Sequence, residues 1–265
     1  VQEKEILFTS GGSESNNMAL FGAAWANQRA GKHIISTSIE HPSVYNPLGM
    51  LEELGFEVTI LPVDHDGHIS LKELEEAIRP DTILVSTMYV NNEVGAVEPV
   101  EEISKIIKAK NPSTLYHVDA IQAYGKYVIR PKKQGIDLLS VSSHKIHGPK
   151  GVGFLYIRNG VKIKPLIYGG GQQAGMRSGT ENVPGVAGFG AAAKEMYTNH
   201  AEKVQKLIEL KDYMTDRLGE IEGTVINSKK GEASAPQIVS VSFEGVRSEV
   251  LLHALEDKGV YVSSA

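Results

Sequence analysis

The chain has 265 residues, of which 41% are hydrophobic and 22% are charged, so it can bury a large core as one or two domains. The net charge of -5 gives no reason to expect binding to nucleic acid or to an anionic membrane, and the lack of cysteine excludes disulfides and thiolate metal sites within these residues. No apolar run approaches the ~20 residues of a membrane span, and no signal segment opens the chain, so we expect a cytoplasmic protein.

The first half of the chain alternates between short strands and helices. Apolar and β-branched runs predict strands at residues 5–9, 33–37, 57–61, 82–87 and 115–118, and helical periodicity follows at about 18–31, 42–55, 71–78 and 100–110. Two further apolar runs, 136–141 and 152–157, flank a polar loop. This alternation is typical of parallel βαβ units and predicts an α/β fold.

One acidic segment invites a metal-site interpretation that its spacing does not support. Residues 64–68 read Asp-His-Asp-Gly-His, but the further ligand and the distal Glu of a calcium-binding loop are missing. A turn is the better prediction there, and we expect no metal site.

Polar side chains gather directly after five of the predicted strands. Ligands of an open parallel sheet collect at the carboxyl ends of its strands, so these clusters predict a ligand site at one edge. Each cluster taken singly has a plainer interpretation as a helix cap or a loop contact. The five clusters begin at Ser10, His41, Asn91, Asp119 and Ser142.

Two of the clusters carry specific chemistry. Gly11-Gly12-Ser13 opens a helix, whose free amide groups and dipole form an anion site, although an N-cap without a ligand is the alternative. Lys145 lies among hydroxyls and imidazoles before a Gly-Pro turn, where it is an amine nucleophile or a solvated charge. Spacing alone does not distinguish Lys145 from Lys150.

The second half of the chain has a different rhythm. A glycine-dense loop at 168–180 precedes one very long helical stretch at 181–218, of the kind that often bridges two domains. Strands near Val225 and at 238–243, a helix at 248–258 and a strand at 260–262 then predict the start of a smaller α+β domain. We therefore expect a large domain at 1–199 and a small domain at 200–265.

A lysine, an anion site, a carboxylate, an imidazole and an asparagine together suit pyridoxal 5′-phosphate. The lysine amine forms a Schiff base with the aldehyde, the helix N-terminus holds the phosphate, and the carboxylate keeps the pyridine nitrogen protonated. Nucleotide binding is the rival, but neither Gly-Pro-Lys-Gly nor Ser-Gly-Gly-Ser matches a phosphate-binding fingerprint.

The sequence resembles the class V aminotransferase group of fold-type I pyridoxal-phosphate enzymes, and specifically the cysteine desulfurases, over essentially its whole length. The matching stretches, in the family's order, are FTSGGSESNN, EHPSV, NNEVG, HVDAIQ, SSHKIHGPKG and GMRSGTENVPG. The resemblance implies a mostly parallel, seven-stranded sheet with helices on both faces.

The resemblance also implies a role for each matched residue. Lys145 is then the Schiff-base lysine, Asp119 pairs with the pyridine nitrogen, and His41 stacks on the ring and assists proton transfer. Asn92 and Gln122 contact the ring oxygen and position the cofactor. The phosphate contacts are Gly12, Ser13, Ser142 and His144, with Thr180 reaching the phosphate of a neighbouring subunit in a homodimer.

The family reaction converts L-cysteine to L-alanine and leaves a persulfide on an enzyme cysteine, from which sulfur passes to an iron–sulfur scaffold or a thiolation partner. That cysteine follows a segment like Val262-Ser263-Ser264, where this chain stops. Natural termini usually trail off in polar residues, so we expect a chain truncated at both ends, which binds cofactor but does not desulfurate cysteine. The alternatives are another class V enzyme, such as a selenocysteine lyase or an aminotransferase, and a non-catalytic remnant.

Overall fold

The computed structural model describes residues 1–264 and separates into two compact units. The first unit comprises Val1–Asn91 and Val97–His200. The second comprises Asn92–Ala96 and the residues from Ala201 onward. A short segment that follows a strand of the first unit therefore belongs, by its contacts, to the second.

The first unit is built on a seven-stranded sheet with the order β1-β7-β6-β5-β4-β2-β3. Strand β7 pairs antiparallel with β1 and β6, and the other neighbouring pairs are parallel. The predicted mostly parallel α/β sheet is therefore confirmed. The strands are β1 (Ile6–Thr9), β2 (His33–Thr37), β3 (Glu57–Leu61), β4 (Thr82–Met88), β5 (Leu115–Asp119), β6 (Leu138–Ser142) and β7 (Gly153–Ile157).

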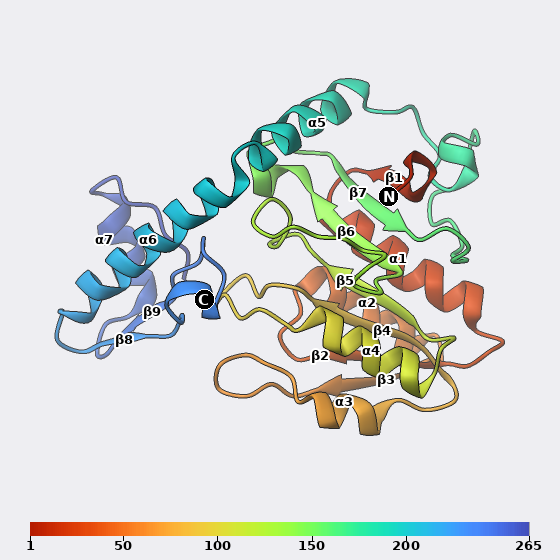
Figure 1. The fold of residues 1–265 in the computed structure, drawn as a ribbon, viewed down its shortest axis with the longest axis horizontal. Coiled ribbons are helices and arrows are strands. Elements are labelled where there is room, and N and C mark those ends of the chain that lie inside the picture. The colour runs from red at the N-terminus through yellow and green to blue at the C-terminus, as the bar shows by residue number, and fades with distance from the viewer. Residues whose placement is uncertain (265) are drawn as a thin grey trace. The chain divides into compact units, whose positions relative to one another are not determined.

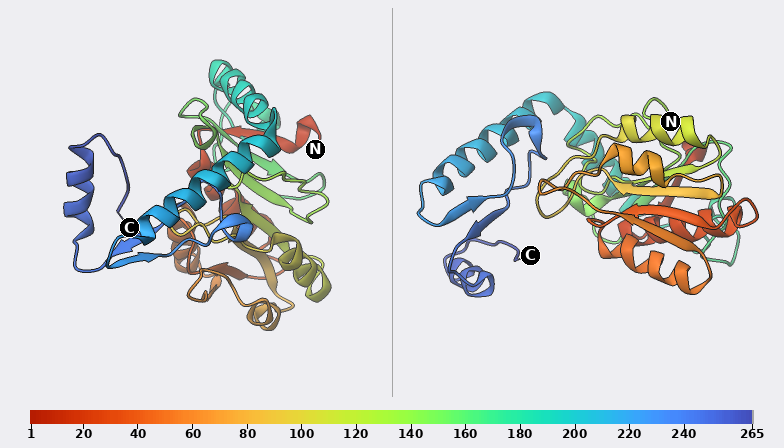
Figure 2. Two further views of the ribbon diagram at one scale, coloured as in Figure 1. Left: turned by 60° about the vertical axis from the view of Figure 1, so that its left-hand side comes forward. Right: turned by 90° about the horizontal axis from the view of Figure 1, so that it is seen from below.

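Helices cover both faces of this sheet. Helices α1 (Gly12–Asn27) and α2 (Pro42–Glu53) lie on one face, and α3 (Leu71–Ala77) and α4 (Val100–Lys110) lie on the other (Figures 1 and 2). Every residue of β2, β4, β5 and β6 is buried, because central parallel strands are covered on both sides. This double burial explains why these strands read as near-continuous apolar and β-branched runs.

Local sequence signals set the starts of two helices. His41 caps α2 by accepting the amide N–H of Ser43 at its Nδ1 atom (3.1 Å), and Pro42 occupies the first helical turn as predicted. Ser70 caps α3, because its hydroxyl accepts the amide N–H of Glu73 (3.3 Å). The cap of α2 matters for function, because the capping residue is also a candidate site residue.

The single long helix predicted at 181–218 is wrong. The structure has two helices there, α5 (Val183–Tyr197) and α6 (His200–Gly219). Asn199 between them has φ 51°, a left-handed conformation that cannot continue a right-handed helix. The helix-favouring composition on both sides hid the break, which depends on the weak helix formers Thr198 and Asn199.

The second unit contains α6 from residue 201 onward, the antiparallel pair β8 (Thr224–Ile226) and β9 (Val241–Phe243), and α7 (Ser248–Glu256). The strand predicted at 260–262 is wrong, since these residues are in neither a strand nor a helix. Gly259 has φ 75°, and the amide N–H of Val260 donates to the carbonyl of Leu255 (2.9 Å). The apolar run therefore closes the C-terminus of α7.

Candidate active site

Five strand ends bring the predicted polar clusters to one edge of the sheet. Strands β1, β2, β4, β5 and β6 run in the same direction, so the residues that follow them meet at their carboxyl ends. All the predicted site residues lie in the first unit, apart from Asn92, which lies in the second.

The N-terminus of α1 forms a tightly packed glycine loop. Gly11 precedes the helix with φ 151°, and no side chain within residues 1–264 caps the helix there. A Cβ atom on Gly12 would lie 2.1 Å from Ile121 Cδ1, and one on Gly153 would lie 2.9 Å from Gly11 Cα. The glycines therefore let the start of α1 approach Ile121 and β7 closely, and the uncapped amide groups suit an anion.

The lysine segment begins where β6 ends. Ser142 is buried, and its hydroxyl is hydrogen-bonded to Nδ1 of His144 (2.8 Å). Burial, together with the positive charges of Lys145 and Lys150, lowers the pKa of His144. Lys145 itself lies on the one-turn 3-10 helix η2 (Ser143–Ile146), and its side chain is exposed. The lysine is thus exposed to solvent and directly follows His144 in the chain.

Asp119 is the buried carboxylate of the site. Its Oδ2 atom accepts a hydrogen bond from Asn16 Nδ2 (2.8 Å), and its Oδ1 atom accepts one from the amide N–H of Ile121 (3.0 Å). Burial raises the pKa of Asp119, while these two donors and the nearby His41 oppose that rise. A buried carboxylate held by two donors suits pairing with a protonated ring nitrogen.

A chain of hydrogen bonds joins this carboxylate to His41. Asn16 Nδ2 also donates to the hydroxyl of Ser43 (2.9 Å), which is hydrogen-bonded to Nδ1 of His41 (2.8 Å). The sequence reasoning missed Asn16 and Ser43 as site residues, although both lie inside the stretches FTSGGSESNN and EHPSV. Asn16 and Ser43 therefore orient the exposed ring of His41 through its Nδ1 atom.

Glu40 is a second buried carboxyl group that the sequence reasoning missed. Its Oε1 atom accepts hydrogen bonds from the Thr37 hydroxyl (2.7 Å) and from the amide N–H of Met88 (2.8 Å). The residue is only half-buried, but its Oε2 atom is buried and has no hydrogen-bond partner among the described residues. Burial raises the pKa of Glu40 to about 8, and the negative charge of Asp119 adds to the rise.

The glycine-dense loop is tied to the start of α1. Arg177 donates from Nε to Glu14 Oε1 (2.8 Å) and from a terminal nitrogen to Oε2 (3.2 Å), while Glu14 Oε2 also accepts the amide N–H of Ser10 (2.8 Å). This bidentate pair is the strong form of an arginine–carboxylate contact. Thr180, three residues further along the loop, is exposed.

The remaining predicted residues are partly exposed. Ser13 in the first turn of α1 is exposed, and Gln122 after β5 is half-buried. Asn92 is also half-buried, and its amide donates to the carboxylate of its neighbour Glu93. The geometry therefore joins His41 to Asp119 and Ser142 to His144 by hydrogen bonds, and it places Gly12 close to Ser142.

The segment at 64–68 forms the predicted turn. Asp64 Oδ1 accepts the amide N–H groups of Asp66 and His68, both at 2.9 Å. No group of three or more His, Asp or Glu side chains within residues 1–264 is arranged to hold a metal ion. Over the same residues, no helix combines the length and apolar character needed to cross a membrane.

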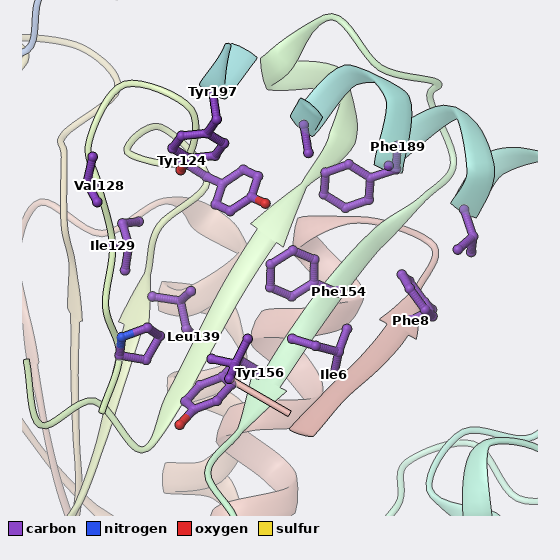
Figure 3. Close-up of a pocket in the computed structure, with 15 residues that line it drawn as sticks. Ile6, Phe8, Tyr124, Val128, Ile129, Leu139, Phe154, Tyr156, Phe189 and Tyr197 are labelled. Atoms are coloured by element: carbon purple, nitrogen blue, oxygen red, sulfur yellow. The ribbon is translucent and has the colours of Figure 1, made fainter. Parts of the chain in front are cut away.

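A separate cavity of about 490 Å³ lies away from these polar groups and carries no charged side chain in its lining. Figure 3 shows the aromatic rings of Tyr124, Phe154 and Phe189 gathered around it. Tyr124 meets Phe154 edge to face, and Phe154 stacks on Phe189, with ring centroids 5.6 Å apart in both pairs. None of the predicted site residues lines this cavity, so it is an apolar feature distinct from the candidate site.

Comparison with known proteins connects this arrangement to a family. The family described as aminotransferase class-V matches residues 1–264. Cysteine desulfurase IscS of Methanosarcina thermophila is 48% identical over 263 residues, which are 99% of this chain and 64% of the relative. The NifS/IcsS protein homolog of Lactobacillus delbrueckii subsp. bulgaricus is 45% identical, over 100% of this chain and 69% of its own length.

Solved structures show the same likeness. A structure titled NIFS-LIKE PROTEIN superposes with a TM-score of 0.97 at 43% identity, covering 100% of this chain and 72% of its own. One titled SspA in complex with cysteine has a TM-score of 0.82 at 34% identity, covering 99% of this chain and 72% of its own. The chain thus spans about two thirds of the length of the curated relatives that it matches.

Proposed function

This chain belongs to the aminotransferase class V family, whose cofactor is pyridoxal 5′-phosphate, and from that premise we propose that the complete protein is a cysteine desulfurase. It would convert L-cysteine to L-alanine and release the sulfur as a persulfide. The names of the curated relatives support this choice over a selenocysteine lyase or an aminotransferase. The observation that carries the proposal is the hydrogen-bonded chain from Asp119 to His41 beside the segment that bears Lys145.

The residues at the sheet edge fit this cofactor. The uncapped N-terminus of α1 and the hydroxyl of Ser142 offer donors for a phosphate, and Gly12 lets this helix start pack closely on Ile121. Asp119 lies buried at the end of β5, where it can hold a proton on a pyridine nitrogen. When bound, the cofactor supplies an aldehyde and an electron-withdrawing ring.

Each protein group then has a defined task. Lys145 provides the amine nucleophile, and its exposure leaves it open to cofactor and substrate. His41 takes and returns a proton at its ring, while Ser43 fixes the ring through Nδ1. The proposal assigns Asn92 and Gln122 to the ring oxygen and to cofactor positioning, and Ser13 and His144 to the phosphate.

The proposal extends to assembly and partners. Thr180 lies exposed on the glycine-dense loop, which suits a contact with the phosphate of a second subunit in a homodimer. The sulfur acceptor would be an iron–sulfur scaffold protein or a thiolation partner, as the IscS names of the relatives suggest. The expected compartment is the cytoplasm.

The thiol of this reaction is not among these residues. The chain contains no cysteine, so residues 1–265 provide no atom on which a persulfide can form. We therefore expect these residues to bind pyridoxal phosphate without desulfurating cysteine. Persulfide formed by a preparation whose intact mass corresponds to these residues alone would contradict that expectation.

The test begins with cofactor attachment. Adding pyridoxal phosphate should produce a visible absorption band that borohydride removes, and peptide mass mapping should place the reduced adduct on Lys145. The variant K145A should lose the band, while K150A, which removes a lysine from the same segment, should keep it. An adduct on Lys150 would overturn the assignment. Release of alanine from cysteine by the complete protein would then test the desulfurase reaction.

A further inference from the structure

A second lysine in the first unit contacts the proposed cofactor lysine. Nζ of Lys126 donates a hydrogen bond of 2.6 Å to the backbone carbonyl of Lys145. The Lys126 side chain is only 7% exposed, although lysine is rarely buried without an acidic partner. Within residues 1–264 no carboxylate lies within ion-pair distance of it. The ammonium group therefore binds the chain segment that carries Lys145 and no carboxylate of the described residues.

The loop that carries Lys126 packs closely on that same segment. It starts at Asp119, and the amide N–H of Lys126 donates to the carbonyl of Ala123 (3.0 Å). Gly125 has φ 84°, and a Cβ atom there would lie 2.7 Å from Cγ2 of Ile146, the residue after Lys145. Such close packing leaves the Lys126 backbone little freedom.

An aromatic hydroxyl secures the same turn. The Tyr197 hydroxyl accepts the amide N–H of Gly125 (3.1 Å) and donates to the carbonyl of Tyr127 (3.1 Å). The loop is thus tied to α5 on one side and to η2 on the other. The chain from Asp119 to Lys126 therefore connects the buried carboxylate of the site to the backbone of Lys145.

Lys126 is buried without a charged partner of opposite sign among the described residues. Burial and the positive charge of Lys145 together lower the pKa of Lys126 to about 8. Lys145 is the one charged group within residues 1–264 that contributes to this shift, so no carboxylate offsets the cost of burying the ammonium group.

We propose that Lys126 is a positioning residue for Lys145, because it anchors the Lys145 carbonyl through a hydrogen bond from its buried side chain. The inference rests on the proposed function, in which Lys145 carries pyridoxal phosphate. The hydrogen bond fixes the backbone from which the Lys145 side chain extends.

Two substitutions test the anchoring contact. K126M removes the hydrogen-bond donor, whereas K126Q keeps one. K150M is the matched control, since it removes an exposed positive charge just beyond η2. Circular dichroism and thermal melts establish that each variant is folded before its cofactor chemistry is compared with that of the wild type.

The readout is the rate of adduct formation at Lys145 with added pyridoxal phosphate. We expect K126M to slow attachment by about tenfold or more, because misplaced reacting groups lose orientation. K126Q should recover part of that rate because it keeps a hydrogen-bond donor, and K150M should leave the rate unchanged.

A folded K126M protein with the wild-type rate would overturn the role of Lys126. A folded K126Q protein as slow as K126M would also overturn it, because a retained donor would then not restore the position of Lys145. If wild-type protein formed no adduct at Lys145, the proposed function itself would fail, and this outcome is distinguishable from failure of the Lys126 proposal.

Discussion

At the scale of single residues, local sequence patterns identify some residues of the candidate site and miss others. The stretches that carry Asp119, His41 and Lys145 are recognisable because each follows a predicted strand. Asn16 and Ser43, which connect two of these groups, could not be found in that way. Asn16 reaches a serine 27 positions away and an aspartate 103 positions away. Only the folded arrangement distinguishes such a contact from a polar residue in a helix.

Glu40 provides a prediction about stability at this scale. Its pKa in the folded protein, about 8, lies above the ordinary 4.5, so the folded state holds a proton that the unfolded state releases between these values. Its contribution to stability is therefore complete below pH 4.5 and is lost as the pH rises through 8. Replacement by glutamine keeps an acceptor for Thr37 and Met88 and removes the titration.

We expect wild-type protein to lose stability relative to E40Q, on the order of a few kcal/mol, between pH 5 and pH 9. Urea unfolding at both pH values, on apoprotein, measures this difference. The neighbouring exposed Ser38 provides the control, because an S38A variant should follow the wild-type pH profile. Parallel pH profiles for E40Q and wild type would show that the carboxyl group is ionised throughout.

At the scale of elements, strands were easier to predict than helix breaks. The predicted bounds of β2 and β3 agree with the structure, because short runs rich in β-branched residues between polar turns favour strands. The break between α5 and α6 has no such signal, since helix-favouring residues continue on both sides. It depends on the backbone of one exposed residue, Asn199.

That break leads to a prediction about one residue. Asn199 has φ 51°, which costs an ordinary L-residue roughly 1–2 kcal/mol and glycine almost nothing. We expect N199A to lower the free energy of unfolding by about 1 kcal/mol. The control N199G should differ from wild type by only a few tenths. Urea titrations of the three proteins test this, and equal stability of N199A and wild type would mean that the left-handed turn is absent in solution.

At the scale of the whole molecule, the division into two units was less visible in the sequence than the sheet. Asn92–Ala96 follows β4 directly, yet it belongs to the second unit. There the carbonyl of Gly95 accepts the amide N–H of Ala235 (2.8 Å), and the carbonyl of Val94 accepts the hydroxyl of Ser228 (2.9 Å). Contacts between residues so distant in sequence leave no periodic pattern to read.

A buried lysine fixes the loop at Ser234 and Ala235 that contacts the segment 92–96. Lys211 on α6 is 3% exposed, and its Nζ donates to the carbonyls of Ser234 and Ala235, both at 3.1 Å, and to the Ser234 hydroxyl (2.6 Å). The second unit therefore holds the segment that begins at Asn92 through a loop that is itself fixed by one ammonium group. Loss of the Lys211 ammonium group should therefore weaken both the loop at Ser234 and Ala235 and the segment 92–96 that this loop contacts.

We expect K211M to speed amide hydrogen exchange in the segment 92–96 as well as near Ala235, with a loss of protection of about 1–3 kcal/mol, because buried carbonyls lose a charged donor. Peptide-resolved exchange followed by mass spectrometry measures both regions in one experiment. K206M, on an exposed part of the same helix, controls for the loss of a lysine. Faster exchange near Ala235 with an unchanged segment 92–96 would show that the segment is held by other contacts. Faster exchange in both regions would show that Lys211 stabilises the backbone of the segment that begins at Asn92.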